Sequence, residues 1–316
     1  MPRDTITTIE CHYIEPERAA AYLVIEGNEG VFVDNNTPHA LPYLMDALKQ
    51  TGRTPAQVSY LIVTHVHLDH SAGTARLLEE CPNATVLCHP RAARHLIDPS
   101  RLVASAKKVY GEALFNKLYG QIDPVPEERI RTVEDGETLD VGERRLTFLH
   151  TRGHANHHIC IHDAKANSVF TGDSFGVAFP ALQRGTRPYI AWAAPPTDFD
   201  PDAARETVER LVNTGAERFC LSHFGKFTAI KEGAAILLRN IDDLDAILNE
   251  AAETALTGNE LRAWCEERLR KVTEEALQAA GLPLNDETFR WVESDQRLNS
   301  LGLAFVAEKR RQTVSG

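Results

Sequence analysis

The chain has 316 residues, 43% of them hydrophobic and 25% charged, which is typical of a globular protein with one large core or one core and a smaller appendage. Its formal net charge of −11 disfavours a nucleic-acid partner, because an acidic surface repels a polyanion unless basic residues are concentrated locally. No apolar stretch is long enough to span a bilayer and the start, MPRDTITTIE, lacks an export signal, so we expect a cytoplasmic protein without a membrane partner.

The first 90 residues predict strands that alternate with helices. The runs AAYLVIEG and GVFVDN flank a GNEG turn and predict a hairpin over residues 20–35. Residues 37–52 have helical spacing, with Leu44, Ala47 and Leu48 on one side and Gly52 at the end. The run SYLIVTH predicts a buried strand, followed by a helix over residues 71–82 and a strand over residues 83–90.

The middle of the chain interrupts this alternation. Residues 91–122 have helical spacing and predict a helical insertion. Strands return between residues 128 and 173 in the runs RIRTVEDG, RRLTFLHT, HHICIHDA and NSVFTGD. Residues 174–200 are rich in Pro and Gly and predict a long functional loop. A helix with Asp200 as N-cap and Pro201 at its first position follows, and then the strand RFCLSHFG.

From residue 229 onward the pattern is helical. We therefore predict a catalytic domain over residues 1–228 and a C-terminal helical extension over residues 229–316. Thr257 and Glu260 predict a capping box, with Leu256 and Leu261 as its hydrophobic staple. The six cysteines are scattered, and we expect them to be free thiols.

The strongest functional signal is THVHLDHSAG, residues 64–73, in which three histidines and one aspartate lie within six positions. His65 and His67 alternate on an extended backbone and point the same way, whereas Asp69 and His70 follow as the chain turns into a helix. Imidazole and carboxylate groups are ligands for Zn²⁺, Mn²⁺ or Fe²⁺. One short turn can thus present two sets of ligands to two adjacent ions.

This segment resembles the HxHxDH signature of the metallo-β-lactamase-fold superfamily. Three later segments agree with that family in type and order: TRGHANHH resembles its TPGHT segment, FTGDSF its GDxLF segment and LSHFGK its late H-G segment. The resemblance covers about residues 7–228, with the glyoxalase II and lactonase branches as the nearest analogies. It implies an α+β fold, a four-layer αββα sandwich, with a helical insertion at about 91–122 and a C-terminal helical extension.

The resemblance also implies two groups of three metal ligands and one bridging ligand: His65, His67 and His154; Asp69, His70 and His223; and Asp173. The cofactors would be two divalent ions, with zinc as the first expectation and iron or manganese as alternatives. Each of the four segments ends a predicted strand, so all of them can converge at one edge of the sandwich.

Two positions depart from the family pattern. Arg152 stands where a proline usually precedes the glycine of the His154 loop. Lactonases of this family often have a tyrosine three residues after the bridging aspartate, and here that position is Gly176. Tyr189 on the following loop could supply the phenol instead.

Several neighbouring residues are candidates for supporting roles. Asp34 stands where the family has an aspartate near the metals, and the resemblance implies that it orients the loop of the first motif rather than binds metal. We expect His158 to fix a ligand or to shuttle protons. For His157 and His158 a polar strand start is an equally good interpretation. Phe224 and Lys226 follow the last ligand and could face the substrate, and a solvated lysine is the alternative for Lys226.

Our hypothesis is hydrolysis of an ester, thioester, lactone or phosphoester by a metal-bridging hydroxide, with Asp69 and Asp173 as catalytic residues and Asp69 as proton relay. A diiron redox protein is the alternative, although that branch has a carboxylate at the position of His67. A nuclease fits the acidic balance less well. Aromatic residues of the insertion, the 174–200 loop and the C-terminal helices could roof the pocket for a small-molecule substrate, or form a homodimer contact.

Overall fold

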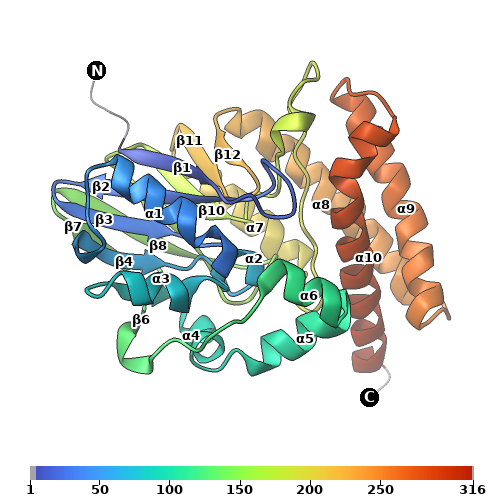
Figure 1. The fold of residues 1–316 in the computed structure, drawn as a ribbon. Coiled ribbons are helices and arrows are strands. Elements are labelled where there is room, and N and C mark those ends of the chain that lie inside the picture. The colour runs from blue at the N-terminus through green and yellow to red at the C-terminus, as the bar shows by residue number, and fades with distance from the viewer. Residues whose placement is uncertain (1–4, 315–316) are drawn as a thin grey trace. The chain divides into compact units, whose positions relative to one another are not determined.

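The computed structural model describes residues 5–314, which form two compact units (Figure 1). Unit 1 comprises the chain up to residue 150 together with residues 157–172 and 216–228. Unit 2 comprises residues 151–156, 173–215 and the chain from residue 229 onward. Each unit therefore collects segments that are distant in sequence, and the predicted boundary at residue 228 stays a prediction.

Unit 1 contains two mixed sheets. The first sheet has its strands in chain order: β1 (Ile6–Glu10), β2 (Ala20–Glu26), β3 (Glu29–Val33), β4 (Val58–Ile62), β5 (Thr85–Cys88) and β6 (Ile130–Thr132). Strands β1 to β3 pair antiparallel, and β3 to β6 pair parallel. The predicted hairpin is confirmed as β2–β3, with Glu26 opposite Glu29 at the turn.

The second sheet has the order β12-β11-β10-β9-β8-β7. Its strands are β7 (Thr138–Val141), β8 (Arg144–Thr151), β9 (His158–Asp163), β10 (Ser168–Gly172), β11 (Arg218–Leu221) and β12 (Gly225–Phe227). Strands β8 and β9 are neighbours joined by six residues, too few for a parallel crossover, so they run antiparallel. Because β10 is antiparallel to β9 and parallel to β11, the segments after β8, β10 and β11 leave this sheet at one edge.

Three layers of the predicted sandwich lie within unit 1. Tyr22 and Val31 of the first sheet pack against Phe148 and Phe170 of the second in a core between the sheets. A separate core joins the other face of the first sheet to helices α1 (Leu41–Gln50), α3 (Thr74–Glu80) and α4 (Pro90–Ile97). Figure 1 shows where these helices lie. The predicted insertion is confirmed as helical, with α4, α5 (Ser100–Tyr110) and α6 (Glu112–Tyr119). Short 3₁₀ turns occupy Pro38–Ala40, Pro55–Gln57 and Glu127–Arg129.

Unit 2 is helical, with α7 (Pro201–Val212), α8 (Ile230–Glu253), α9 (Gly258–Ala279) and α10 (Asp286–Val314), and α8, α9 and α10 lie side by side (Figure 1). Residues 174–200 have only a 3₁₀ turn at Pro180–Leu182 and a bridge between Val177 and Ala191. Helix α7 begins as predicted, because the Asp200 side chain accepts a hydrogen bond from the Ala203 N–H at 3.1 Å. Throughout residues 5–314, every helix is too short or too polar to cross a membrane.

Two local features differ from the prediction: one strand was missed, and one cap was wrong. Strand β7 was not predicted, because its four residues, TLDV, lie between two turn signals and are too few to show a periodicity. The capping box does not form: Thr257 is the N-cap of α9, but its side chain makes no capping hydrogen bond. The Gly258 N–H, another donor at the start of α9 that lacks a partner within the helix, donates to Glu308 of α10 at 2.8 Å, so an acceptor fifty residues away caps this helix.

Candidate metal centre

The first motif follows β4 (Val58–Ile62) after one residue, and its second half forms α2 (Leu68–Ser71). His67 is the N-cap, with an extended backbone, so His65 and His67 project before the helix and Asp69 and His70 from its first turn. The Nε2 atom of His65 lies 2.9 Å from Nδ1 of His67, and the His65 ring centroid is 4.1 Å from that of His70. Since His65 and His70 are almost fully buried, their polar atoms need partners or an ion.

Asp34 directly follows β3 and holds this loop through its hydrogen bonds. Its carboxylate, 2% exposed, accepts hydrogen bonds at 2.9 Å from the Thr64 backbone and hydroxyl, from the Ser222 hydroxyl and from Nδ1 of His70. A carboxylate can only accept, so the proton of His70 sits on Nδ1 and the lone pair on Nε2. Asp34 thus fixes the tautomer and orientation of a candidate ligand and joins the ends of β3, β4 and β11.

His223, which follows β11, is held in the same manner by a different group. Its Nδ1 donates to the Arg18 carbonyl at 2.7 Å, so its Nε2 also carries a lone pair. That Nε2 atom lies 3.3 Å from Nε2 of His70 and 3.3 Å from a carboxylate oxygen of Asp69. Two imidazole lone pairs and a carboxylate therefore converge on one point.

This donor set fits a divalent cation. Lone pairs that face one another at this distance repel unless a cation or a proton lies between them. Two ligands bound to one zinc ion with tetrahedral geometry at about 2.1 Å are separated by about 3.4 Å, close to the observed spacing. The ligand atoms of Asp69, His70 and His223 all lie within 4.8 Å of one another. We refer to these three residues as the unit 1 triad.

In unit 2, His154 and Asp173 form a pair in which a hydrogen bond likewise fixes the histidine. Nδ1 of His154 donates to the Ala193 carbonyl at 3.0 Å, which directs the Nε2 lone pair toward the Asp173 carboxylate at 3.5 Å. Both side chains are buried. The histidine and the carboxylate are therefore arranged as two ligands of a cation would be.

The two departures from the family pattern have physical explanations within unit 2. The Arg152 carbonyl accepts from the Thr207 hydroxyl at 2.8 Å, so α7 anchors this loop without a proline. Gly153 has a φ of +106°, and a Cβ there would lie 2.5 Å from Ala204. Gly176 has a φ of +69°, and a Cβ would lie 2.4 Å from the Ala191 carbonyl oxygen. No tyrosine fits at position 176 with this backbone.

The supporting residues predicted from sequence differ in where they lie. The fully buried His158 stacks on His65 with ring centroids 4.7 Å apart, and the half-buried His157 lies 6.2 Å from the same ring. Phe224 packs against the core between the two sheets. The Lys226 ammonium donates to the Ile6 carbonyl, at the end of β1 farther from the triad.

Tyr189 lies in an apolar cluster of unit 2 that includes Leu277 and Trp291. Burial raises the pKa of its hydroxyl, and the nearby Asp295 raises that pKa further. The tyrosine is therefore a neutral, buried side chain.

Some groups that hold the ligands were not found from the sequence. The Thr64 and Ser222 hydroxyls that donate to Asp34 lie directly before His65 and His223, so their place beside two ligands was an available signal. The Arg18 and Ala193 carbonyls had no signal, because any residue carries a backbone oxygen.

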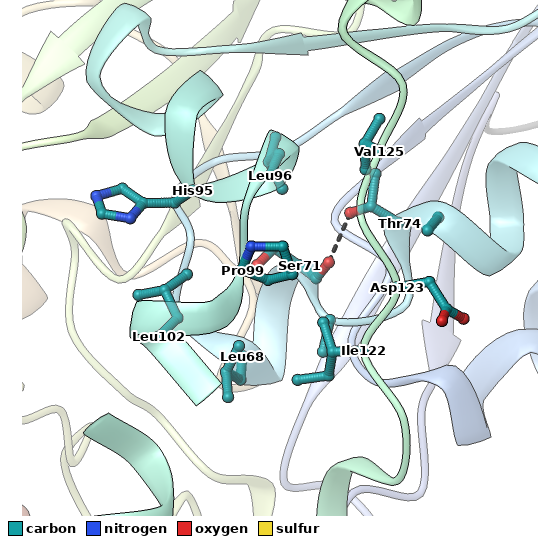
Figure 2. A pocket seen from close by; sticks show the side chains of 12 residues that line it. Leu68, Ser71, Thr74, His95, Leu96, Pro99, Leu102, Ile122, Asp123 and Val125 are labelled. Atoms are coloured by element: carbon teal, nitrogen blue, oxygen red, sulfur yellow. Dashed lines mark hydrogen bonds between the residues drawn. The ribbon is translucent and has the colours of Figure 1, made fainter. Parts of the chain in front are cut away.

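One face of helix α2 packs against the insertion. Figure 2 shows Leu68, Leu102 and Ile122 around a small cavity on that side, with His95 and Asp123 at its margins. The volume, about 10 Å³, is room for no more than a water molecule. This face of α2 therefore serves packing rather than substrate binding.

Comparison with known proteins identifies the family. The sequence model of the metallo-beta-lactamase superfamily matches residues 14–223, which contain every candidate ligand. The chain belongs to the metallo-beta-lactamase superfamily. The match confirms the resemblance seen in the four motifs and, with the two mixed sheets and their helices, the predicted fold class.

One relative matches the chain in both sequence and structure. The chain is 30% identical over 138 residues to the metallo-beta-lactamase fold-containing protein ST1585 of Sulfurisphaera tokodaii, covering 42% of this chain and 51% of that protein. The crystal structure of ST1585 superposes with a TM-score of 0.65 at 20% identity, covering 96% of this chain and 99% of the other.

Two further relatives carry activity names. The coenzyme F420H(2) oxidase of Methanothermobacter marburgensis is 34% identical over 136 residues, covering 42% of this chain and 28% of that protein. The acyl-coenzyme A thioesterase MBLAC2 of Gallus gallus is 29% identical over 118 residues, covering 35% and 40%. The chain thus spans between about a quarter and a half of the curated relatives it matches.

Proposed function

We propose that this superfamily member is a metal-dependent hydrolase that uses two divalent cations, zinc in the first place, to cleave a small acyl substrate: an ester, thioester or lactone. Phosphoesters are the remaining class. The observation that carries the proposal is the unit 1 triad, in which two histidines with protonated Nδ1 atoms direct their Nε2 lone pairs at each other and at a carboxylate.

In this proposal one cation takes His65, His67 and His154, a second takes the unit 1 triad, and Asp173 is shared. The strand order supports it, because the segments that carry His154, Asp173 and His223 leave the second sheet at the same edge. The hydrogen bonds from Thr64 and Ser222 to Asp34 join the ends of strands from the two sheets within unit 1. When bound, such cations make hydroxide available at neutral pH and polarise the scissile carbonyl.

The chain's own residues then have distinct tasks. Asp34 and the Arg18 carbonyl hold the Nδ1 protons of His70 and His223, so each ring keeps the tautomer that a ligand needs. Asp69 is 25% exposed, whereas His70 is 1% exposed. The Asp69 carboxylate is therefore the most exposed part of the triad, and we assign it the role of proton relay to the leaving group.

A diiron redox protein is the second candidate, favoured by the similarity to the coenzyme F420H(2) oxidase. Against it stands His67, since iron sites of that branch use a carboxylate there. An iron-dependent visible spectrum together with oxygen consumption would establish the redox function. A colourless zinc protein would exclude it.

The test combines metal analysis with a substrate panel. The purified protein should contain about two zinc ions per chain and hydrolyse at least one of an ester, a thioester, a lactone and a phosphoester. Asp69→Ala and His223→Ala should each lower the metal content and reduce activity by at least about a hundredfold, since even residues that merely orient ligands cost 10–100-fold. Lys49→Ala, which removes an exposed ammonium group in the last turn of α1, is the control and should change neither. Full activity in a folded Asp69→Ala protein would overturn the proposal.

Two further expectations remain proposals. All six cysteines are buried free thiols, which supports a reducing compartment such as the cytoplasm. A homodimer and the lack of a nucleic-acid partner stay predictions from the sequence.

A further inference from the structure

Residues 191–194 of unit 2 form a stretch of backbone whose two edges have different partners. On one edge a backbone bridge holds Ala191, and the Ala193 carbonyl accepts the hydrogen bond from Nδ1 of His154 at 3.0 Å. Successive residues of an extended chain direct their backbone groups to opposite sides, so the second and fourth residues of the stretch face the other edge. The stretch thus carries the oxygen that orients a candidate ligand.

Two asparagines from the C-terminal helices complete the other edge. Asn299 of α10 accepts from the Ala194 N–H at 2.8 Å and donates to the Trp192 carbonyl at 3.3 Å. Asn240 of α8 accepts from the Trp192 N–H at 2.8 Å. Trp192 and Ala194 are almost fully buried, so their N–H groups need acceptors from the protein. The two carboxamides supply the hydrogen bonds that a neighbouring strand would otherwise make.

Asn299 acts on the same peptide unit that orients His154. The Ala193 carbonyl and the Ala194 N–H belong to one planar trans peptide unit, in which the two groups point in opposite directions. The Oδ1 atom of Asn299 holds the N–H end and the imidazole of His154 holds the carbonyl end. The unit therefore cannot rotate without losing both hydrogen bonds, and bonds in such a chain also strengthen one another.

Asn240 holds a different peptide unit. The Trp192 N–H that donates to Asn240 shares its unit with the Ala191 carbonyl, which accepts from the Val177 N–H at 2.8 Å. That carbonyl does not contact the histidine. The two asparagines therefore form a matched pair, because they have the same side chain and hold the same stretch but only Asn299 holds the unit that faces His154.

Helix α10 comes unusually close to this stretch. Gly302 lies one turn after Asn299, and residues three apart lie on the same face of a helix. A Cβ at position 302 would lie 2.1 Å from the Ala194 carbonyl oxygen. The absence of a side chain at Gly302 thus lets the helix approach the backbone that the short side chain of Asn299 has to reach.

The contact of Asn299 has a consequence for metal binding. In the proposed function, on which this inference rests, His154 binds a cation through its Nε2 lone pair. That lone pair is available only while the ring proton stays on Nδ1, where the Ala193 carbonyl accepts it. We propose that Asn299 is a positioning residue for this ligand: by fixing the peptide unit between Ala193 and Ala194, it keeps His154 in the tautomer and orientation that metal binding requires.

The first test uses the metal-free protein and nitrogen-15 NMR of the histidine rings at mildly alkaline pH, where histidine is neutral. His154→Gln removes the His154 signals and so assigns them. The wild type should show a slowly exchanging proton on Nδ1 and none on Nε2. Asn299→Leu, a substitution of similar volume, should lose the slow exchange and show both tautomers. Asn240→Leu is the matched control and should keep the wild-type pattern, although it also removes an acceptor from a buried N–H.

The second test is zinc affinity, measured by competition with a chromophoric chelator. Asn299→Leu should weaken the binding of one of the two zinc ions about tenfold, the lower end of the effect of groups that orient ligands. The other ion, held by the unit 1 triad, should bind as in the wild type, and Asn240→Leu should change neither. If Asn299→Leu does not fold, Asn299→Ala leaves room for a water molecule at the peptide unit and should show smaller changes in the same direction.

Four outcomes decide between the two proposals. Loss of the Nδ1 proton and weaker binding of one zinc ion in Asn299→Leu alone would support the positioning role. A wild-type NMR pattern in folded Asn299→Leu would overturn that role, while hydrolysis in the substrate panel would still support the proposed function. The expected NMR difference in a protein that neither binds zinc nor hydrolyses any substrate would do the reverse. Equal changes in both leucine variants would show a general loosening of the stretch and would overturn the positioning role.

Discussion

Two regions of unit 1 each hold the Nδ1 proton of a triad histidine, and they do so with different chemistry. At the end of β3 the side chain of Asp34 holds His70, whereas in the segment between β1 and β2 the backbone carbonyl of Arg18 holds His223. A carboxylate adds a negative charge and can be removed by one substitution. A carbonyl has only a partial charge and can be displaced only by moving the segment around it. The two histidines should therefore respond differently to mutation.

Asp34→Asn is the strongest way to break this comparison. An amide has one oxygen and one donor group, so it cannot accept from Thr64, Ser222 and His70 together, and at least one buried donor is left unpaired. We expect the affinity of the triad for zinc to fall about 10–100-fold. Competition with a chromophoric chelator measures it. Ser222→Ala, which removes a single neutral donor, should have a smaller effect, and equal effects would contradict the central role of the carboxylate.

Glu10→Gln tests the other region. Glutamine keeps one of the two acceptor oxygens that hold His12 and Glu17, so the segment between β1 and β2 loosens without losing the Arg18 carbonyl. We expect the free energy of unfolding to fall by about 1 kcal/mol and zinc affinity to fall less than for Asp34→Asn. Denaturant unfolding and the same chelator competition provide both numbers. A loss of affinity as large as that of Asp34→Asn would mean that the two regions are equivalent.

Ile14→Gly sharpens the comparison in the opposite direction. Ile14 is 61% exposed and β-branched, yet its φ is +64°, so its side chain gains little from burial while its backbone is strained. Glycine should raise the free energy of unfolding by about 1 kcal/mol, the relieved strain less the added chain entropy. Thermal unfolding of Ile14→Gly beside Ile14→Ala, which keeps the strain, checks this. A gain in the alanine variant alone would contradict it.

His89 provides the smallest effect and a reference away from the triad. Burial lowers its pKa from 6.5 to about 4, with the neighbouring His150 and Arg91 as further causes. The unfolded chain therefore binds a proton between pH 6.5 and 4 that the folded chain does not, so stability is complete above this window and is lost as the pH falls through it. The slope is at most about 1.4 kcal/mol per pH unit for one proton, and less for a partly exposed ring.

The measurement is unfolding by denaturant at several pH values, for the wild type and for His89→Asn. Asparagine can still accept from the Arg91 N–H as an N-cap, as His89 does at 2.9 Å, but it does not titrate. The variant should lose less stability between pH 6.5 and 4. Identical slopes would assign the acid sensitivity to other groups.

Local signals in the sequence predicted much of the framework. Asp200 followed by Pro201 marked the start of α7, and the alternation around GNEG marked the β2–β3 hairpin, because caps and turns depend on neighbouring residues. The orienting role of Asp34 was predicted from the family resemblance, which places an aspartate there, and its hydrogen bonds show how it could perform that role. The ligands of the first motif could be predicted because a strand that turns into a helix brings side chains close in sequence together in space.

The rest depends on contacts between distant segments, and no local pattern reports them. Glu308 accepts from the Gly258 N–H at the start of α9, and this cap comes from α10, fifty residues away in sequence. The Arg18 carbonyl that holds His223 is 205 residues away from it in sequence, and Tyr13 is 106 residues away from Tyr119 in sequence. Backbone oxygens and isolated tyrosines occur everywhere in a sequence, so their function appears only when the fold places them.

The close approach of Gly176 to the Ala191 carbonyl has a consequence for protein engineering. A laboratory attempt to graft the lactonase phenol onto this scaffold would begin with Gly176→Tyr, and that substitution would place a Cβ 2.4 Å from the carbonyl oxygen. The bridge between Val177 and Ala191 would have to open first. Access to that chemistry therefore requires rebuilding a loop as a whole, and libraries that vary single positions around the ligands will not reach it.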